Sequence, residues 1–177
     1  MRVAARMFAS QPFHQVKLDA IAARARIGKG TIYVYFASKD DLYLTLIADG
    51  MAQLIAELRQ VRGGAAAWPA LARAVGALLG FADRFPHLYT LMRSGLPIQE
   101  SRLTHKRTEL VHELVRILRS GVRSGELEDP RPELTAEFVL SCVRSALLFA
   151  PARTSRATMV RHILRVLGRG ILRKGSR

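Results

Sequence analysis

The chain has 177 residues and a formal net charge of +14 at pH 7, and 49% of its residues are hydrophobic. These values are typical of a folded globular protein and exclude disordered and fibrous classes. Its single cysteine, Cys142, excludes an internal disulfide bond and any cysteine-based metal site. The apolar run 146–152 is interrupted by Pro151, and no apolar run is long enough to cross a bilayer. The first residues lack the features of a signal peptide. We therefore expect a cytoplasmic protein without a membrane anchor.

Proline and glycine divide the chain into blocks of helical length, and no segment shows the strict alternation of a half-buried strand. The pattern predicts an all-α protein of about nine helices. They are expected at 2–10, 18–25, 29–35, 38–62, 66–84, 85–94, 97–124, 131–150 and 154–174. Because three very short helices precede longer ones, we expect a small N-terminal module on a larger helical body.

The start of the fourth predicted helix has a recognisable cap. Ser38 and Asp41 form a Ser-x-x-Asp capping box, and Asp40 and Asp41 place negative charge near the positive end of the helix dipole. Lys39 lies in the same turn, where a cation is unfavourable. An external anion would compensate it, so the sequence predicts a phosphate contact at Lys39.

The segment 17–36 is typical of two short helices joined by a tight turn. Leu18, Ile21 and Ala22 share one face of the first helix, and Ile32 and Phe36 form the buried face of the second. Two helices that cross near a right angle in this way leave the outer face of 29–35 free to enter a DNA major groove.

The outward residues of 29–35 suit contact with DNA. Lys29 can reach a phosphate or a guanine edge, and Thr31 offers a hydroxyl and a methyl group. Tyr33 and Tyr35 present phenolic donors to the phosphate backbone. Gly30 allows the backbone to approach the duplex closely, which explains a glycine inside a helix, where it costs about 1 kcal/mol relative to alanine. The overall basic charge also suits a polyanion, with nucleic acid as the first candidate and an anionic membrane surface as the second.

These residues carry a family resemblance. The runs Ala-Ala-Arg-Met-Phe-Ala (4–9), Leu-x-x-Ile-Ala (18–22) and Gly-Lys-Gly-Thr-Ile-Tyr-x-Tyr-Phe-x-Ser-Lys-Asp-x-Leu (28–42) resemble the N-terminal domain of the TetR family of bacterial transcriptional regulators. The resemblance covers about the first 47 residues. It implies a helix-turn-helix DNA-binding domain at 1–47, with its motif at 17–36, and an effector-binding and dimerisation domain at 48–177.

The resemblance also implies a function: a ligand-responsive repressor that binds a pseudo-palindromic operator as a homodimer and is released by a small-molecule effector. The DNA contacts expected from the motif are Lys29, Gly30, Thr31, Tyr33, Tyr35 and Lys39, and Lys17 is expected to add a phosphate contact. No cofactor and no metal are expected. No catalytic constellation is visible, so we do not expect an enzyme.

The chain departs from the usual family pattern at several positions. Pro12 replaces a common glycine, Lys17 occupies the place of a Ser or Thr cap, and Arg26 stands where a helix end often needs a positive φ. Only three residues precede Ala4, whereas family members carry more. We therefore expect either that the natural protein has extra N-terminal residues or that its DNA-binding domain is unusually weak.

The body offers candidates for an effector pocket. Aromatic side chains commonly line such pockets, and Glu109 and His112 lie on one face of helix 97–124. The candidates are Trp68, Phe81, Phe85, Tyr89, Glu109, His112 and Phe138. Plain core packing is the alternative for each aromatic residue, and a zinc site formed by His105, Glu109 and His112 is the alternative for that helix face.

Helices 131–150 and 154–174 carry wide apolar faces, which favour a homodimer through a four-helix interface. An arginine recurs every fourth residue along the last helix, at positions 161, 165, 169 and 173. This row sustains a different hypothesis, a basic helical adaptor or a protein that binds anionic membranes.

Overall fold

The computed structural model describes residues 1–60, 66–85, 101–151 and 153–172. These residues form eight α-helices, one short 3₁₀-helix and a single isolated β-bridge. The elements are α1 (Arg2–Ser10), η1 (Phe13–Gln15), α2 (Leu18–Ala25), α3 (Lys29–Tyr35), α4 (Lys39–Gln60), α5 (Ala67–Arg84), α7 (Ser101–Ser124), α8 (Pro132–Phe149) and α9 (Arg156–Ile171).

The prediction of an all-α fold is confirmed, and the helices of the described part begin and end close to the predicted residues. The expected helix at 85–94 lies outside the described residues. The sequence did not predict η1. Pro12, with φ −55°, precedes this turn, and the ring of Phe13 packs against those of Phe8 and Tyr43 with centroids 5.5 and 5.3 Å apart. Although Pro12 departs from the family pattern, the chain connects α1 to α2 through this short 3₁₀ turn.

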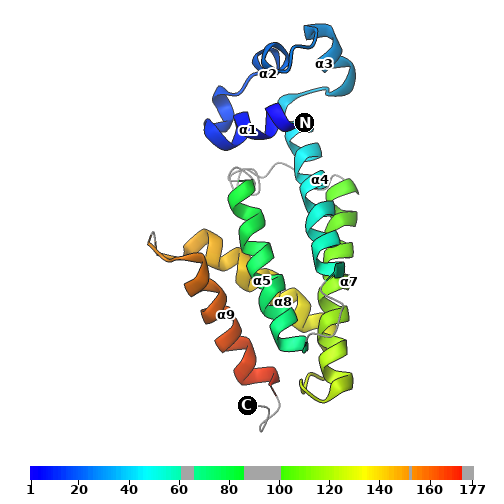
Figure 1. The fold of residues 1–177 in the computed structure, drawn as a ribbon, viewed down its shortest axis with the longest axis vertical. Coiled ribbons are helices and arrows are strands. Elements are labelled where there is room, and N and C mark those ends of the chain that lie inside the picture. Colours follow the sequence, from blue (N-terminus) through cyan, green and yellow to red (C-terminus); the bar gives the residue numbers. More distant parts are fainter. Residues whose placement is uncertain (61–65, 86–100, 152, 173–177) are drawn as a thin grey trace.

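Helices α1–α3 form a small head at one end of the molecule, and α4 leads from this head into the body (Figure 1). In the body, α4 lies beside α7, which packs against α5 and α8, and α9 packs against α5 and α8. None of the described helices is long and apolar enough to span a membrane.

The body is held together by fully buried aliphatic side chains from its central helices. Leu54 and Leu58 of α4, Leu71 of α5, and Leu114 and Leu118 of α7 are each at most 1% exposed. Each such side chain contributes about 1.5–3 kcal/mol to folding through its removal from water. The apolar stripe along α4 therefore fixes this helix to the body, and Tyr43, whose ring centroid lies 4.7 Å from that of Phe8, joins it to the head.

The turn after α7 connects three elements. Gly125 adopts a positive φ of 74°, and the backbone N–H of Glu128 donates to the carbonyl oxygen of Ile171 at 2.8 Å. The carboxylate of Glu126 accepts hydrogen bonds from the backbone N–H groups of Ala67 and Trp68, at 2.6 and 3.0 Å. Helix α5 has no cap from its own preceding residue, so Glu126 satisfies its free donors from a distant part of the chain.

Candidate DNA-binding head and effector cavity

Helix α3 turns its polar and phenolic side chains away from the head. Ile32 is buried, whereas Lys29, Gly30 and Thr31 are exposed. Tyr33 and Tyr35 are 48% and 72% exposed, so neither is part of the core. The outer face of α3 is thus available to a partner along its whole length.

The turn between α2 and α3 sets the angle of the outward helix. Leu18 and Ile21 of α2 and Ile32 of α3 are buried together in the head. Arg26 ends α2 with φ 56° and ψ 43°, and the N–H of Ile27 reaches back to the Ala22 carbonyl at 3.1 Å. Arg26 thus has the positive φ that the sequence indicated at this helix end. It occupies a left-handed position where glycine is more usual. Ile27 itself is exposed.

One carboxylate organises two of the predicted DNA contacts. Asp19 Oδ2 lies 2.7 Å from Lys29 Nζ, and Asp19 Oδ1 accepts a hydrogen bond of 3.1 Å from the Tyr33 hydroxyl. The hydrogen bond from Lys29 holds the pKa of Asp19 below its ordinary value, and Asp19 in turn raises the pKa of Lys29. Both groups therefore stay charged at neutral pH, and Lys29 already has an anionic partner within the head.

Lys39 has a partner inside the protein. Its Nζ donates to the carbonyl oxygen of Phe13 at 2.9 Å and lies 4.6 Å from the centre of the Phe13 ring. A carbonyl oxygen and a ring face within the protein therefore already help to compensate this cation. A phosphate contact at Lys39 stays a prediction.

The cap of α4 forms as predicted. Ser38 Oγ accepts from the N–H of Asp41 at 3.0 Å, and Asp41 Oδ2 accepts from the N–H of Ala37 at 3.0 Å. At the start of α2, Lys17 occupies the cap position without a side-chain hydrogen bond and is exposed. The side chain of Lys17 therefore does not cap α2.

Sequence reasoning missed two residues of this surface. Asp19 was not singled out, although it lies two residues after Lys17 in the motif. Val34 is 80% exposed on α3, three residues after Thr31, and shares its helix face. Helical spacing alone would have found Val34, whose methyl groups suit contact with a thymine methyl.

The body contains a cavity of about 290 Å³ between α4, α5, α7 and α8. Helix α4 contributes Ile47, Met51 and Leu54 to its lining, and α5 contributes Leu78 and Phe81. The other lining residues come from α7 and α8: Leu103, Thr104, Arg107, Leu110, Leu140, Ser141, Val143 and Arg144. Its size and apolar walls are typical of a small-molecule site.

The family model for bacterial regulatory proteins of the tetR family matches residues 1–46, the segment that forms the head and the first turns of α4. The N-terminal domain of this chain belongs to the TetR family. A fatty acid metabolism regulator of Bacillus subtilis is 26% identical over 71% of this chain and 68% of its own length. The transcriptional regulator RutR of Escherichia coli K12 is 25% identical over 81% of this chain and 70% of its own.

Solved structures share the TetR fold along nearly the whole chain. A TetR/AcrR-family regulator from Thermobifida fusca has a TM-score of 0.79 at 23% identity, covering 96% of this chain and 94% of that one. FadR from Bacillus subtilis, solved with stearoyl-CoA, has a TM-score of 0.76 at 19% identity over 94% of each chain. A regulator from Saccharomonospora viridis, solved with choline, has a TM-score of 0.74 at 19% identity over 98% and 95%. The family model and the curated relatives together identify the protein as a DNA-binding transcriptional regulator.

The structure does not bring the predicted pocket residues of this TetR-family regulator together. Phe81 lines the cavity, and the ring of Phe85 packs against that of Phe81 in a tilted arrangement, with centroids 4.7 Å apart. Phe138 points to solvent from α8 and is 54% exposed. Tyr89 lies outside the described residues. The remaining candidates, Trp68, Glu109 and His112, lie elsewhere.

Glu109 belongs to an ion-pair network that joins α4 to α7. Arg59 lies 3.3 Å from Glu109 and donates to Glu113 at 2.9 Å, and Arg116 reaches both Glu113 and the Leu58 carbonyl. Burial raises the pKa of Glu113, but the hydrogen bonds from Arg59 and Arg116 outweigh it and hold that pKa below its ordinary value. The network fixes the C-terminal end of α4. Within the described residues no group of three ligands forms a metal site, and His112 is exposed.

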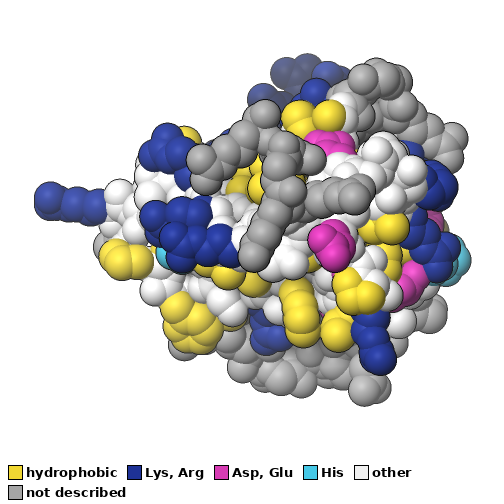
Figure 2. Space-filling view, turned by 90° about the horizontal axis from the view of Figure 1, so that it is seen from below, with side chains coloured by type: hydrophobic (Ala, Val, Ile, Leu, Met, Phe, Trp, Pro, Cys, Tyr) yellow, Lys and Arg dark blue, Asp and Glu magenta, His cyan; other side chains and the backbone are white. Residues whose placement is uncertain are grey.

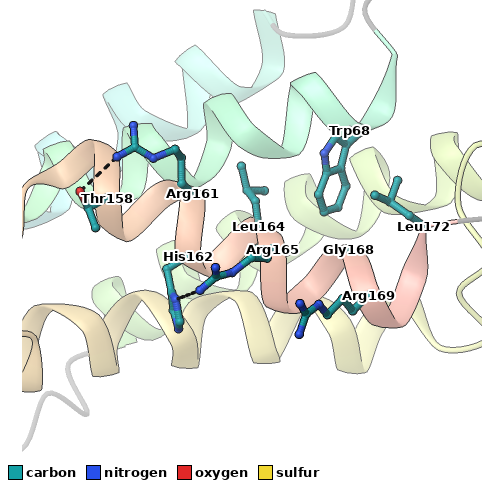
Figure 3. A pocket seen from close by; sticks show the side chains of 9 residues that line it. All are labelled: Trp68, Thr158, Arg161, His162, Leu164, Arg165, Gly168, Arg169 and Leu172. Carbon is teal, nitrogen blue, oxygen red and sulfur yellow. Dashed lines mark hydrogen bonds between the residues drawn. The ribbon is translucent and has the colours of Figure 1, made fainter. Parts of the chain in front are cut away.

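Trp68 borders a second, open groove of about 720 Å³ beside α9 (Figure 3). Arg161, Arg165 and Arg169 of the predicted arginine row line it, and Arg173 lies outside the described residues. Arg161 donates to the Thr158 hydroxyl at 3.3 Å, and Arg165 lies 3.1 Å from His162 Nδ1. At this end of the molecule, away from the head, Lys and Arg side chains lie on several sides of the surface (Figure 2).

Proposed function

We propose that this TetR-family regulator is a repressor that binds a pseudo-palindromic operator as a homodimer and releases it when a small molecule fills the cavity. We assign DNA binding to residues 1–47, with Lys17, Lys29, Gly30, Thr31, Tyr33, Tyr35 and Lys39 at the duplex. Effector binding and dimerisation are assigned to residues 48–177.

One observation carries this proposal: a single helix belongs to both parts. Helix α4 begins at Lys39, shortly after the end of α3, and its residues Ile47, Met51 and Leu54 line the cavity. A ligand that prefers a different position of α4 shifts the population of head orientations and so changes the affinity for DNA.

The outer faces of α8 and α9 support a dimer. Phe138 and Phe149 of α8 are 54% and 79% exposed, and Val166 of α9 is 55% exposed. Pairing these helices with those of a second copy would cover the three side chains in a four-helix interface. Two heads related by a two-fold axis would then reach successive major grooves about 34–36 Å apart.

Operator binding measured across a range of salt concentrations tests the proposal. Affinity should fall steeply with salt, with a log–log slope of roughly −5 to −9, because several phosphates are neutralised. Lys39→Ala should weaken binding to all duplexes about equally, and Thr31→Ala should relax sequence preference. An unchanged affinity in Lys39→Ala would remove Lys39 from the interface, and salt-independent binding would contradict the proposed function.

A further inference from the structure

The cavity between α4, α5, α7 and α8 has apolar walls and a basic edge. Its buried lining side chains are aliphatic or aromatic, among them Ile47, Leu54 and Phe81. Its polar lining side chains all lie at the solvent edge, where they are exposed: Thr104, Arg107, Ser141 and Arg144. A ligand that fills this cavity therefore meets apolar surface inside and cations at the opening.

The four polar residues form two matching pairs. Thr104 and Arg107 lie three residues apart on α7, and Ser141 and Arg144 lie three residues apart on α8, so each pair shares one helix face. The ion pairs Arg107–Glu137 and Arg119–Glu133 fix the antiparallel register of the two helices. In this register both hydroxyl–guanidinium pairs border the same opening.

Among the described residues, the charge at this opening is not balanced. No Asp or Glu is among the described residues that line the cavity. Glu137 pairs with Arg107, whereas no carboxylate in the described part of the chain pairs with Arg144. A cationic ligand would be repelled here, and a neutral apolar ligand would remove water from Arg144 without replacing its hydrogen bonds.

We infer that the effector is an anionic amphiphile: an apolar body between the cavity walls and one carboxylate or phosphate head group at Arg144, with Ser141, Thr104 and Arg107 beside it. This inference rests on the proposed role of the cavity as the effector site. The volume of about 290 Å³ lies at the lower end of the range for ligand pockets, which favours a small apolar body.

Calorimetric titration of the full chain with four compounds of one chain length tests the inference. The compounds are octanoate, octyl phosphate, octan-1-ol and octylammonium. Octanoate or octyl phosphate should bind at least about tenfold more tightly than octan-1-ol, and octylammonium should bind least. The two anions distinguish a carboxylate from a phosphate head. Equal or tighter binding of octylammonium, or no binding of either anion, overturns the inference.

Substitutions locate the head group. Arg144→Gln should weaken binding of the preferred anion about tenfold and leave octan-1-ol unchanged, because only the charged contact is lost. Arg123→Gln removes the same charge from an exposed site at the far end of α7 and serves as the matched control. If Arg144→Gln and Arg123→Gln change the affinity for the preferred anion equally, the assignment of the head group to Arg144 is wrong.

Operator binding separates this inference from the proposed function. Anion binding that responds to Arg144→Gln but leaves operator affinity unchanged supports the ligand class and contradicts effector control. Operator binding that persists while neither anion binds supports the DNA-binding role and overturns the ligand class.

Discussion

Gly30 lies on the outer face of α3, and a Cβ atom at this position would meet no protein atom within 4 Å. The fold therefore does not require glycine here, although glycine weakens a helix. The absence of a structural reason favours a functional one, the close approach of the α3 backbone to DNA.

Gly30→Ala should separate stability from function. We expect the free energy of unfolding to rise by about 0.5–1 kcal/mol, because alanine has the higher helix propensity. Operator affinity should fall about tenfold, because the new methyl group stands between backbone and duplex. Denaturant unfolding and a DNA titration measure the two effects. Gly76→Ala on α5, which also meets nothing within 4 Å, is the control and should change stability alone.

Asp19 places a negative charge within the predicted DNA surface. Because Lys29 holds the pKa of Asp19 low, the carboxylate is ionised throughout the neutral and mildly acidic range. Asp19→Asn should raise affinity for any duplex several-fold and make the salt dependence steeper, because Lys29 no longer shares its charge. Asp49→Asn, an equal charge change on an exposed part of α4, should have a smaller effect. A fall in affinity for Asp19→Asn would show that Asp19 positions Lys29 and Tyr33 for DNA.

Helix α5 shows how the fold compensates a helix start that has no local cap. Its first N–H groups, at Ala67 and Trp68, bond to the carboxylate of Glu126 from the turn after α7. Glu126→Ala should lower the free energy of unfolding by about 1–2 kcal/mol, because two donors lose their charged acceptor. Thermal unfolding measures this loss. Glu128→Ala, at an exposed neighbouring position, should leave stability unchanged, and an equal loss in both variants would contradict the capping role.

Helix boundaries followed from the sequence because their signals are local. The Ser38–Asp41 cap, the positive φ at Arg26 and the breaks at proline and glycine depend only on neighbouring residues. The capping of α5 by Glu126 and the contact of Lys39 with Phe13 were not predictable, because each joins residues that are distant along the chain. The lining of the cavity was predicted only in part. Whether an aromatic residue such as Phe81 or Phe138 faces inward or outward depends on how its helix is rotated against the others, and contacts between distant residues set this rotation.

The exposed aromatic side chains of α8 bear on the assembly of the whole molecule. Phe138→Asp should convert a dimer into a monomer and weaken operator binding, because a charge would be buried in the proposed interface. Sedimentation velocity and a DNA titration measure both effects. Val122→Asp, at an exposed apolar position on α7, is the control. A dimer that persists in Phe138→Asp would place the interface elsewhere.

Helix α4 runs without a break through 22 residues, which corresponds to about 33 Å. With its C-terminal end held by the Arg59 network, the helix would act as a lever in the proposed mechanism, because Lys39 at the head lies farther from that end than Met51 at the cavity. At this length a tilt of about 6° sweeps the far end through an arc of about 3.5 Å, roughly one base-pair step. In a two-fold assembly both arms would swing, so a displacement of the size of one methyl group beside Met51 is enough to misalign both heads with their half-sites.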